Sequence, residues 1–270
     1  MSPCSGGDRI ATAIRDGARG GSPAIVAYLT AGWPTPERFA RLVPEIAAEA
    51  DVVEIGVPFS DPMADGATIQ RTSRVALENG VDLRSILAAL ASVAPRADVP
   101  FVLMSYVNPL LAYGLEALAS DAAAAGVAGL IVPDLPIEES AACDSAFAMH
   151  GIAMIRLATP ATPEERLFRL ARASQGFLYA VTVNGVTGGS AEPPIDRLRQ
   201  HLARVRAATD LPICAGFGMR SAEQVRALAG AADGVIVGSA LLEAIEAGAD
   251  GASFLRALRA PLDASQGGRP

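Results

Sequence analysis

The sequence contains no lysine, and this absence excludes several kinds of chemistry. All 22 residues counted as lysine or arginine are arginines, so the cationic side chains apart from two histidines are guanidinium groups. Such a chain has no side-chain amine to form a Schiff base with a carbonyl substrate or to hold pyridoxal phosphate covalently. A lysine that clamps a phosphate group is excluded for the same reason.

Cysteine and histidine are too few and too scattered for a disulfide framework or a metal site. The three cysteines, Cys4, Cys143 and Cys214, are odd in number and far apart, which favours a reducing compartment. His150 and His201 lie in helical patterns, and neither has a second histidine at metal-ligand spacing. We therefore expect neither a metal ion nor a bound cofactor.

Long apolar runs and an excess of positive charge are also missing. No run reaches the roughly 18 apolar residues of a membrane-spanning helix, and residues 1–17 lack the charged-then-apolar order of a signal peptide. The formal net charge is -7 and the pI is near 4.9, which leaves no basic surface for nucleic acid. These features predict a cytoplasmic protein that binds neither membranes nor nucleic acids.

Eight short apolar runs recur along the chain, separated by longer stretches, most of them with helical spacing. Continuous apolar runs are typical of parallel strands whose sheet is covered by helices. The stretches between them place apolar residues three and four apart, and several begin with a Thr, Asp or Ser that can cap a helix. The runs occupy residues 24–29, 51–57, 100–106, 128–134, 152–158, 176–183, 212–218 and 233–239.

Eight such units predict a closed (β/α)8 barrel, the TIM barrel fold, with residues 8–20 as an extra helix before it. A chain of 270 residues is a usual length for one barrel domain, and no linker or change of composition divides it. We expect a single domain over residues 1–270. A doubly wound open sheet is the alternative that the same pattern allows. The expected helices include residues 35–49, 82–94, 115–126, 162–174, 195–208 and 221–230.

A glutamate, Glu54, interrupts the second apolar run. Because side chains alternate along a strand, Glu54 points into the barrel if Val53 and Ile55 point outward. Burial disfavours the charged form, so we expect a raised pKa and a carboxyl group that can give and take a proton near neutrality. The alternative is a structural glutamate that is paired with an arginine or hydrogen-bonded across the barrel.

Polar residues gather where the predicted strands end, at the face on which such barrels carry their active sites. The loop after the second strand supplies Asp61 and Asp65, although Asp-Pro and Asp-Gly are also ordinary turn pairs. Other polar side chains at this rim could belong to a site or merely close a barrel layer or cap a helix. They are Tyr28, Thr30, Tyr106, Asn108, Asp134, Tyr179 and Thr182.

Glycines follow the seventh and eighth predicted strands. Gly216 and Gly218 lie in "AGFGMRSAEQV", and Gly238 and Ser239 open the helix in "GVIVGSALLEA". Glycine lets backbone N–H groups approach an anion, and a helix N-terminus favours negative charge. Since many barrels hold phosphate after these two strands, the pattern favours a phosphate site over plain turns.

A series of motifs closely resembles the α subunit family of tryptophan synthase. In order they are "VEIGVPFSDPMADGATIQ", "YVNP", "GLIVPDLPIEES", "ATPATP", "GVTG", "GFG" and "VGSA", within residues 10–260. The resemblance implies a (β/α)8 lyase of tryptophan biosynthesis that cleaves indole-3-glycerol phosphate to indole and glyceraldehyde 3-phosphate. It also implies a partner, the pyridoxal-phosphate-dependent β subunit, in an α2β2 heterotetramer.

The resemblance also assigns roles to matching residues. It implies that Glu54 donates and accepts the proton and that Asp65 lies near the indole nitrogen. Tyr179 matches a tyrosine on the substrate side, and the other expected substrate-binding residues are Tyr28, Thr30, Tyr106 and Thr187. The expected phosphate-binding residues are Gly188, Phe217, Gly218, Gly238 and Ser239.

The missing lysine fits this reaction. Breaking the carbon–carbon bond of an aldol needs an electron sink, and without a lysine imine or a metal the substrate must supply it. A proton added at C3 of the indole gives an indoleninium ion whose C=N bond takes the electrons. Buried, protonated Glu54 suits that proton transfer, and Asp65, nearer solvent and ionised, suits the charge at N1.

Some positions depart from the family pattern. Ala67 stands where proline is usual, Trp33 replaces an aspartate or tyrosine, and "GVTGGSAE" lacks an arginine that often follows "GVTG". We expect nothing local to hold Asp65 rigidly, because its loop contains Gly66 and a turn-forming Asp-Pro pair. The glycine-rich residues 183–194 are expected to form a mobile lid over the phosphate.

Other functions stay open at this stage. The barrel could be a different phosphate-binding isomerase or synthase of amino-acid biosynthesis, or a largely regulatory subunit. It could also be a stand-alone lyase that releases indole without a β partner.

Overall fold

Eight parallel strands form a closed barrel in which each strand pairs with the next in sequence and β8 pairs with β1. The computed structural model describes residues 5–94, 97–181, 195–216 and 218–259. The strands are β1 (Ala24–Thr30), β2 (Val52–Gly56), β3 (Phe101–Met104), β4 (Val127–Ile131), β5 (Ala153–Ala158), β6 (Leu178–Val181), β7 (Ile213–Gly216) and β8 (Gly234–Val237).

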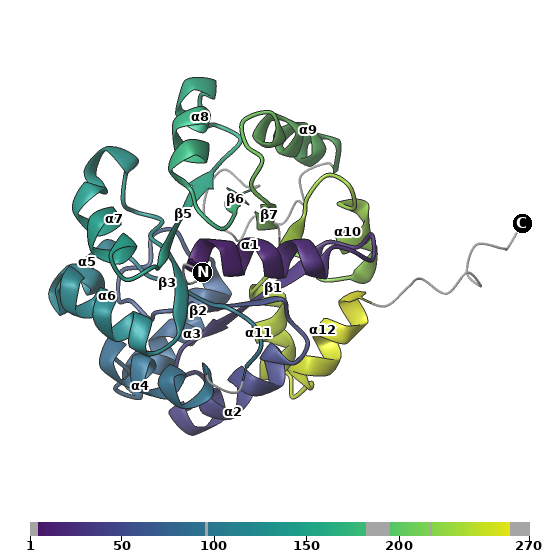
Figure 1. The fold of residues 1–270 in the computed structure, drawn as a ribbon. Coiled ribbons are helices and arrows are strands. Elements are labelled where there is room, and N and C mark those ends of the chain that lie inside the picture. Colours follow the sequence, from purple (N-terminus) through teal and green to yellow (C-terminus); the bar gives the residue numbers. More distant parts are fainter. Residues whose placement is uncertain (1–4, 95–96, 182–194, 217, 260–270) are drawn as a thin grey trace, which may run out of the picture.

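Helices surround the barrel and cover its outer face (Figure 1). Several begin with the side-chain caps that the sequence predicted: Thr35 accepts from the Arg38 amide, and Asp82 and Ser221 form capping boxes. The helices are α1 (Gly6–Gly17), α2 (Pro36–Ala47), α3 (Ala67–Glu78), α4 (Leu83–Val93), α5 (Val107–Tyr113), α6 (Leu115–Ala124), the 3-10 turn η2 (Ile137–Glu139), α7 (Ala141–Ala148), α8 (Glu164–Ala173), α9 (Ile195–Arg206), α10 (Ala222–Ala227), α11 (Ser239–Glu246) and α12 (Gly251–Arg259).

Two apolar cores lie on the two sides of the strands. Val53 and Ile55 belong to the larger core between the strands and the outer helices. Val52, which precedes Val53 and so faces the opposite side of the strand, belongs to the smaller core inside the barrel, and Glu54 alternates with Val53 and Ile55 in the same way. The inward direction predicted for Glu54 therefore holds.

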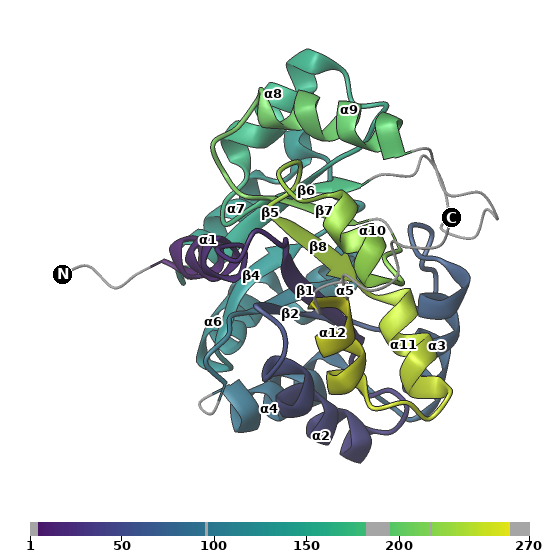
Figure 2. The same cartoon turned by 90° about the vertical axis from the view of Figure 1, so that its right-hand side faces the viewer.

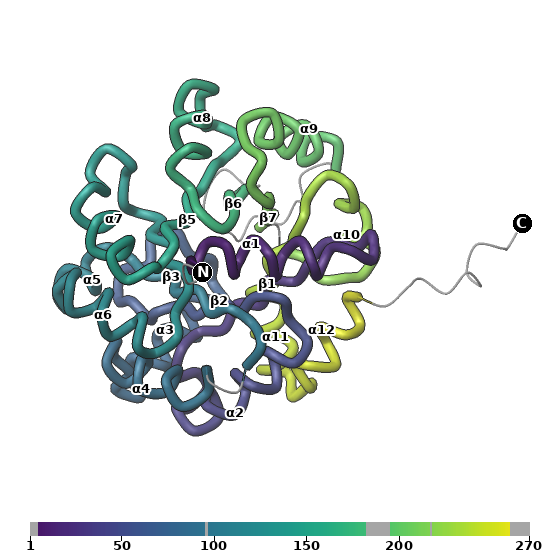
Figure 3. Tube along the Cα trace, viewed as in Figure 1, coloured from purple at the N-terminus to yellow at the C-terminus, as the bar shows by residue number. Residues whose placement is uncertain are grey.

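Helix α1 closes the amino end of the barrel. It lies across the barrel axis in Figure 1 and in the tube of Figure 3. Ile10 and Ile14 are fully buried and pack into the core inside the barrel. A Cβ atom on Gly6 would lie 2.0 Å from the carbonyl oxygen of Ala128, so only glycine allows this close approach of α1 to β4.

The last helix joins the first units of the barrel. Helix α12 packs against α2, α10 and α11. The Arg259 guanidinium donates to the carbonyl oxygen of Glu49 at 3.1 Å and to the Asp51 carboxylate at 2.5 Å, just before β2. These bonds fix the end of the described chain to the loop that leads into the strand carrying Glu54.

The predicted (β/α)8 barrel is confirmed, and the pairing of β1 with β8 shows that the open-sheet alternative is wrong. Every strand overlaps its predicted run, and residues 6–17 form the extra helix that was expected at 8–20. Helices α3, α5, α7 and α12 are not among the predicted segments. The extent of the domain, residues 1–270, includes ends outside the described ranges and stays a prediction. In the described part of the chain, no helix combines the length and the apolar character needed to cross a membrane.

Candidate active site

Glu54 lies on β2 inside the barrel, with only 1% of its surface exposed. Its Cα is paired with that of Tyr28 on β1 and with that of Val102 on β3. Among the described residues, Glu54 has no ion pair, and its Oε2 atom has no hydrogen-bond partner. A structural glutamate neutralised by an arginine does not fit this environment, because a buried charge without a partner is costly.

The Asp65 carboxyl group influences the Glu54 carboxyl group electrostatically. Burial, followed by the nearby Asp65 charge, raises the pKa of Glu54 to about 8. Burial also raises the pKa of Asp65, but a hydrogen bond with Tyr106 opposes the shift, so its pKa is about 6. Between these values, Glu54 holds a proton while Asp65 is charged, which is the order the sequence predicted.

The Asp65 segment is held by one local hydrogen bond and by one from a residue distant in the sequence. The Ala64 amide donates to the Tyr106 hydroxyl at 2.9 Å, and the Gln70 side-chain amide donates to the Asp65 carbonyl oxygen at 2.8 Å. The ring of Tyr106 stacks on Phe59, with centroids 5.1 Å apart. The expectation that nothing local holds Asp65 is therefore wrong. Gln70 lies in the motif "ADGATIQ", but the sequence pattern indicates a turn in this segment and does not predict a role for the Gln70 side chain.

Two tyrosines lie inside the barrel, each beside a glycine on the neighbouring strand. A Cβ atom on Gly56 would lie 2.0 Å from the Tyr28 hydroxyl oxygen, and one on Gly216 would lie 2.5 Å from Cε1 of Tyr179. Burial raises the pKa of both tyrosines, and the charges of Glu54 and Asp65 add to the shift. Gly216 thus makes room for Tyr179, whereas the sequence had grouped it with the phosphate-binding glycines.

Other predicted polar residues of the rim have structural contacts. The hydroxyl of Thr30 lies 2.7 Å from that of Thr72 on α3, and both residues are buried. Asp134 accepts a hydrogen bond from the Val107 amide at the start of α5. Asp61 is exposed to solvent. Substrate binding by Thr30 stays a prediction, because its hydroxyl also helps to join β1 to α3.

Gly218, Gly238 and Ser239 lie at the carboxyl ends of β7 and β8. Gly218 has a φ of +64°, and no atom lies within 4 Å of the position a Cβ would take. Gly238 is the N-cap of α11, and Ser239 is its first residue. Backbone N–H groups at the start of this helix suit an anion. The other expected ligands, Thr187, Gly188 and Phe217, lie outside the described residues.

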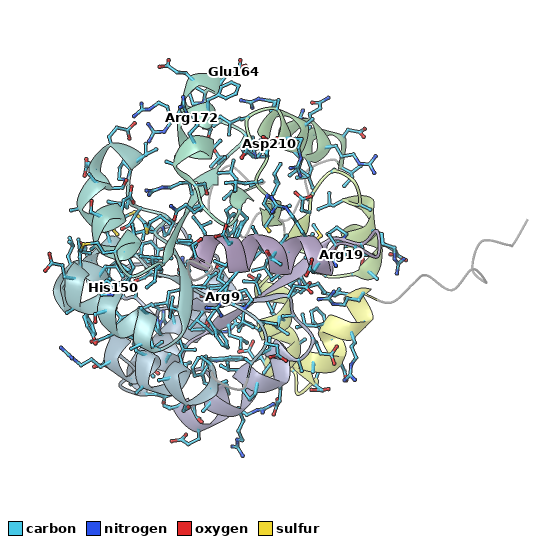
Figure 4. All side chains as sticks on the ribbon, viewed as in Figure 1. Arg9, Arg19, His150, Glu164, Arg172 and Asp210 are labelled. Atoms are coloured by element: carbon cyan, nitrogen blue, oxygen red, sulfur yellow. The ribbon has the colours of Figure 1, made fainter. Side chains whose placement is uncertain are left out.

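The two histidines do not form a metal site. His150 lies at the periphery of the molecule, as Figure 4 shows, and its side chain is exposed. His201 is buried in α9, and burial lowers its pKa. Across the described ranges, no group of three or more His, Cys, Asp or Glu side chains is arranged to hold a metal ion.

Comparison with known proteins identifies the family. The family model described as "Tryptophan synthase alpha chain" matches residues 16–261. The chain is 44% identical to the tryptophan synthase alpha chain of Nitratidesulfovibrio vulgaris (strain DP4) over 250 residues, which cover 92% of this chain and 97% of that protein. The chain belongs to the tryptophan synthase alpha chain family. The alpha chain of Roseiflexus sp. (strain RS-1) is 46% identical over 240 residues, with 88% and 92% of the two chains covered.

Solved structures of tryptophan synthase agree with this assignment. A structure of the Mycobacterium tuberculosis enzyme superposes with a TM-score of 0.83 and 38% identity, covering 93% of this chain and 95% of that chain. Tryptophan synthase subunit alpha from Legionella pneumophila gives a TM-score of 0.84 and 32% identity, covering 93% and 97%. Family membership makes the protein a lyase of tryptophan biosynthesis that cleaves indole-3-glycerol phosphate to indole and glyceraldehyde 3-phosphate. It also implies a β-subunit partner.

Proposed function

We propose that Glu54 and Asp65 are the two groups that carry out this cleavage. The observation that carries the proposal is the difference in environment between the two carboxyl groups. Glu54 is fully buried with a pKa of about 8, whereas Asp65 is partly exposed with a pKa of about 6. Two acids whose environments separate their pKa values are suited to different roles in one reaction.

In the first step, the protonated Glu54 carboxyl group delivers its proton to C3 of the indole ring. The C2–C3 double bond supplies the electron pair for the new C3–H bond, and the positive charge appears on the C=N1 bond. The charged Asp65 carboxylate stabilises this cation through its position near N1. Charge stabilisation of this kind is strong where solvent is excluded.

In the second step, the bond between C3 and the glycerol phosphate chain breaks. Its electron pair restores the aromatic indole and neutralises N1. The hydroxyl group on the adjacent glycerol carbon becomes the aldehyde of glyceraldehyde 3-phosphate and loses its proton. Glu54, ionised by the first step, accepts that proton and returns to its starting form.

The substrate is proposed to lie along the carboxyl end of the barrel. The indole ring lies among Tyr28, Tyr106 and Tyr179, whose rings offer apolar surface around the two carboxyl groups. The phosphate group lies over Gly218, Gly238 and Ser239, where backbone N–H groups compensate for the lack of lysine. Thr187, Gly188 and Phe217 are proposed to complete the binding site.

The same rim is the proposed contact with the pyridoxal-phosphate-dependent β subunit, in a cytoplasmic α2β2 complex. Met63, in the loop before Asp65, is 76% exposed, and Leu111 on α5 is 57% exposed. Contiguous exposed apolar patches are typical of partner surfaces, and these two side chains are proposed to contribute to one. A ring of partner contacts here would cover the mouth of the barrel.

The test is release of indole from indole-3-glycerol phosphate by the purified chain, with and without a β subunit. Glu54→Gln keeps the shape of the side chain but removes its proton, so we expect turnover to fall by about two orders of magnitude or more while substrate still binds. Asp65→Asn should cause a similar loss. Near-normal turnover by a folded Glu54→Gln protein would overturn the proposed role. A rate that is fast without a β subunit and unchanged by it would favour a stand-alone lyase.

A further inference from the structure

Two polar contacts join α3 to α11, although these helices are far apart in the sequence. Thr68 Oγ1 donates to Glu243 Oε1 at 2.7 Å. Further along, the Arg71 guanidinium donates to both carboxylate oxygens of Glu246, at 3.1 and 2.5 Å. Figure 2 shows α3 and α11 side by side. We call these four residues the α3–α11 seam.

Glu243 makes one further contact that Glu246 does not share. Arg220 Nη1 donates to Glu243 Oε2 at 2.6 Å. Arg220 lies in the loop between β7 and α10, two residues after Gly218. One carboxylate therefore joins three segments, because one oxygen binds the start of α3 and the other binds the β7–α10 loop. The hydrogen bonds from Arg220 and Thr68 lower the pKa of Glu243, which keeps it ionised near neutrality.

The three joined segments are the ones that carry the proposed chemistry. Thr68 is the second residue of α3, whose N-cap, Gly66, directly follows Asp65. Gln70, in the same first turns of α3, holds the Asp65 carbonyl oxygen at 2.8 Å. Glu243 lies four residues after Ser239 and so shares its face of α11. A chain of hydrogen bonds therefore connects α11 and the Gly218 loop to the backbone of Asp65.

We propose that Glu243 is a positioning residue that couples the phosphate site to the Asp65 carboxylate. When a phosphate group binds at Gly218, Gly238 and Ser239, it fixes α11 and the β7–α10 loop. Glu243 then holds the start of α3, and with it Asp65, in the position that faces the indole ring. This inference rests on the proposed roles of Asp65 and of the phosphate-binding residues.

A role in stability alone would leave a different signature. The side chains of Arg220 and Glu243 are 56% and 34% exposed, and ion pairs this close to solvent contribute little to folding. Replacing Glu243 is therefore expected to leave the fold intact, and its effects can be measured on the folded protein. The quantity that separates coupling from stability is the effect of one bound ligand on the affinity for another.

The experiment is titration of the full-length chain with indole, at zero and at saturating inorganic phosphate. In the unaltered protein, phosphate should tighten indole binding about fivefold or more, the usual lower range of such coupling. The coupling ratio is the Kd for indole without phosphate divided by the Kd for indole with saturating phosphate. Glu243→Ala should bring this ratio close to one while indole binding without phosphate is nearly unchanged. Glu243→Gln keeps the shape and one acceptor oxygen, so its ratio should be intermediate. Turnover of indole-3-glycerol phosphate by Glu243→Ala should fall by about tenfold, as expected for a misplaced group.

Glu246→Ala is the matched control, because it breaks the other contact of the seam and leaves Arg220 with Glu243. It should keep the coupling ratio of the unaltered protein. The inference is overturned if phosphate does not affect indole binding in the unaltered protein, or if Glu243→Ala keeps the full ratio. Turnover by Glu54→Gln is measured alongside. Normal turnover by this variant contradicts the proposed function. If Glu54→Gln is inactive but Glu243→Ala keeps the full coupling ratio, only the coupling is contradicted.

Discussion

The hydroxyl oxygen of Tyr28 occupies the space that a side chain on Gly56 would fill, since a Cβ there would lie only 2.0 Å away. The two residues are on adjacent strands, and Glu54 is the residue next to Gly56 on the same face of β2. The missing side chain therefore lets Tyr28 lie beside the buried carboxyl group.

Gly56→Ala should displace the Tyr28 ring and overpack the interior of the barrel. We expect the free energy of unfolding to fall by about 1–3 kcal/mol, as overpacked cores do, and indole release to fall as well. Chemical denaturation and the indole assay measure the two effects. In a Tyr28→Ala background, Gly56→Ala should lower the free energy of unfolding much less. Equal decreases in both backgrounds would contradict the contact between Tyr28 and Gly56.

The pH profile of kcat/KM should be bell-shaped. Activity requires charged Asp65 and protonated Glu54, so it should decline below about 6 as Asp65 gains a proton and above about 8 as Glu54 loses one. Asp65→Asn should remove the acid limb from whatever activity is left, and an unchanged acid limb would assign it to another group.

The contribution of Glu54 to the stability of the fold should depend on pH in the opposite sense to that of a salt-bridged carboxylate. The pKa of Glu54 rises from 4.5 to about 8 on folding, so between these values the folded chain binds more protons than the unfolded chain. The stabilisation is complete below about 4.5 and is lost as the pH rises through 8.

Denaturation of the unaltered protein and of Glu54→Gln, from pH 5 to 8, measures this effect. Relative to Glu54→Gln, the unaltered protein should lose stability with rising pH, with a slope of at most about 1.4 kcal/mol per pH unit for one group. Parallel curves for the two proteins would show that Glu54 is not titrating in this range.

Gly218→Val should weaken phosphate binding and spare indole. The residue has a φ of +64°, and a side chain there would enter the open space from which the anion approaches the backbone. Gly230→Val is a close control, because Gly230 has a φ of +74° and open space around it but lies before β8, at the amino end of the barrel. Both should lose about 1–2 kcal/mol of stability from the left-handed backbone. Titration with inorganic phosphate should distinguish them, and equal phosphate affinities would argue against the site.

Ala67→Pro should stabilise the Asp65 segment. Ala67 is the first residue of α3, where proline is well tolerated, and Gly66 has a φ of −78° and a ψ of 167°, the extended backbone that proline requires before it. We expect a gain of about 0.4–1 kcal/mol in unfolding free energy and a smaller stimulation of indole release by a β subunit.

Ala141→Pro provides the contrast for that substitution. Ala141 also begins a helix, α7, but the preceding Ser140 has a φ of −83° and a ψ of −7°, which proline disfavours. This variant should be less stable than the unaltered protein. An Ala67→Pro protein that is destabilised to the same extent would show that the start of α3 does not have the backbone described.

The sequence was most informative where local pattern decides structure. The apolar run around Glu54 predicted a strand and the inward direction of its carboxyl group, because alternation is a local property. The hold on Asp65 was missed because the Tyr106 hydroxyl that binds Ala64 comes from a residue 42 positions away. The contact between Thr68 and Glu243 spans 175 positions. Such polar contacts leave no periodic signal, since each depends on how the closed barrel brings its loops together.

Helix α1 closes the amino end of the barrel and leaves the carboxyl end as the side from which ligands can enter. Ile10 and Ile14 fill the interior at the amino end. Among the described elements, substrate and products therefore pass through the mouth of the barrel at the carboxyl ends of the strands. Indole and glyceraldehyde 3-phosphate must leave by the route on which their parent arrived. A protein bound over this mouth would therefore control both arrival and departure, and it would meet released indole before the solvent does.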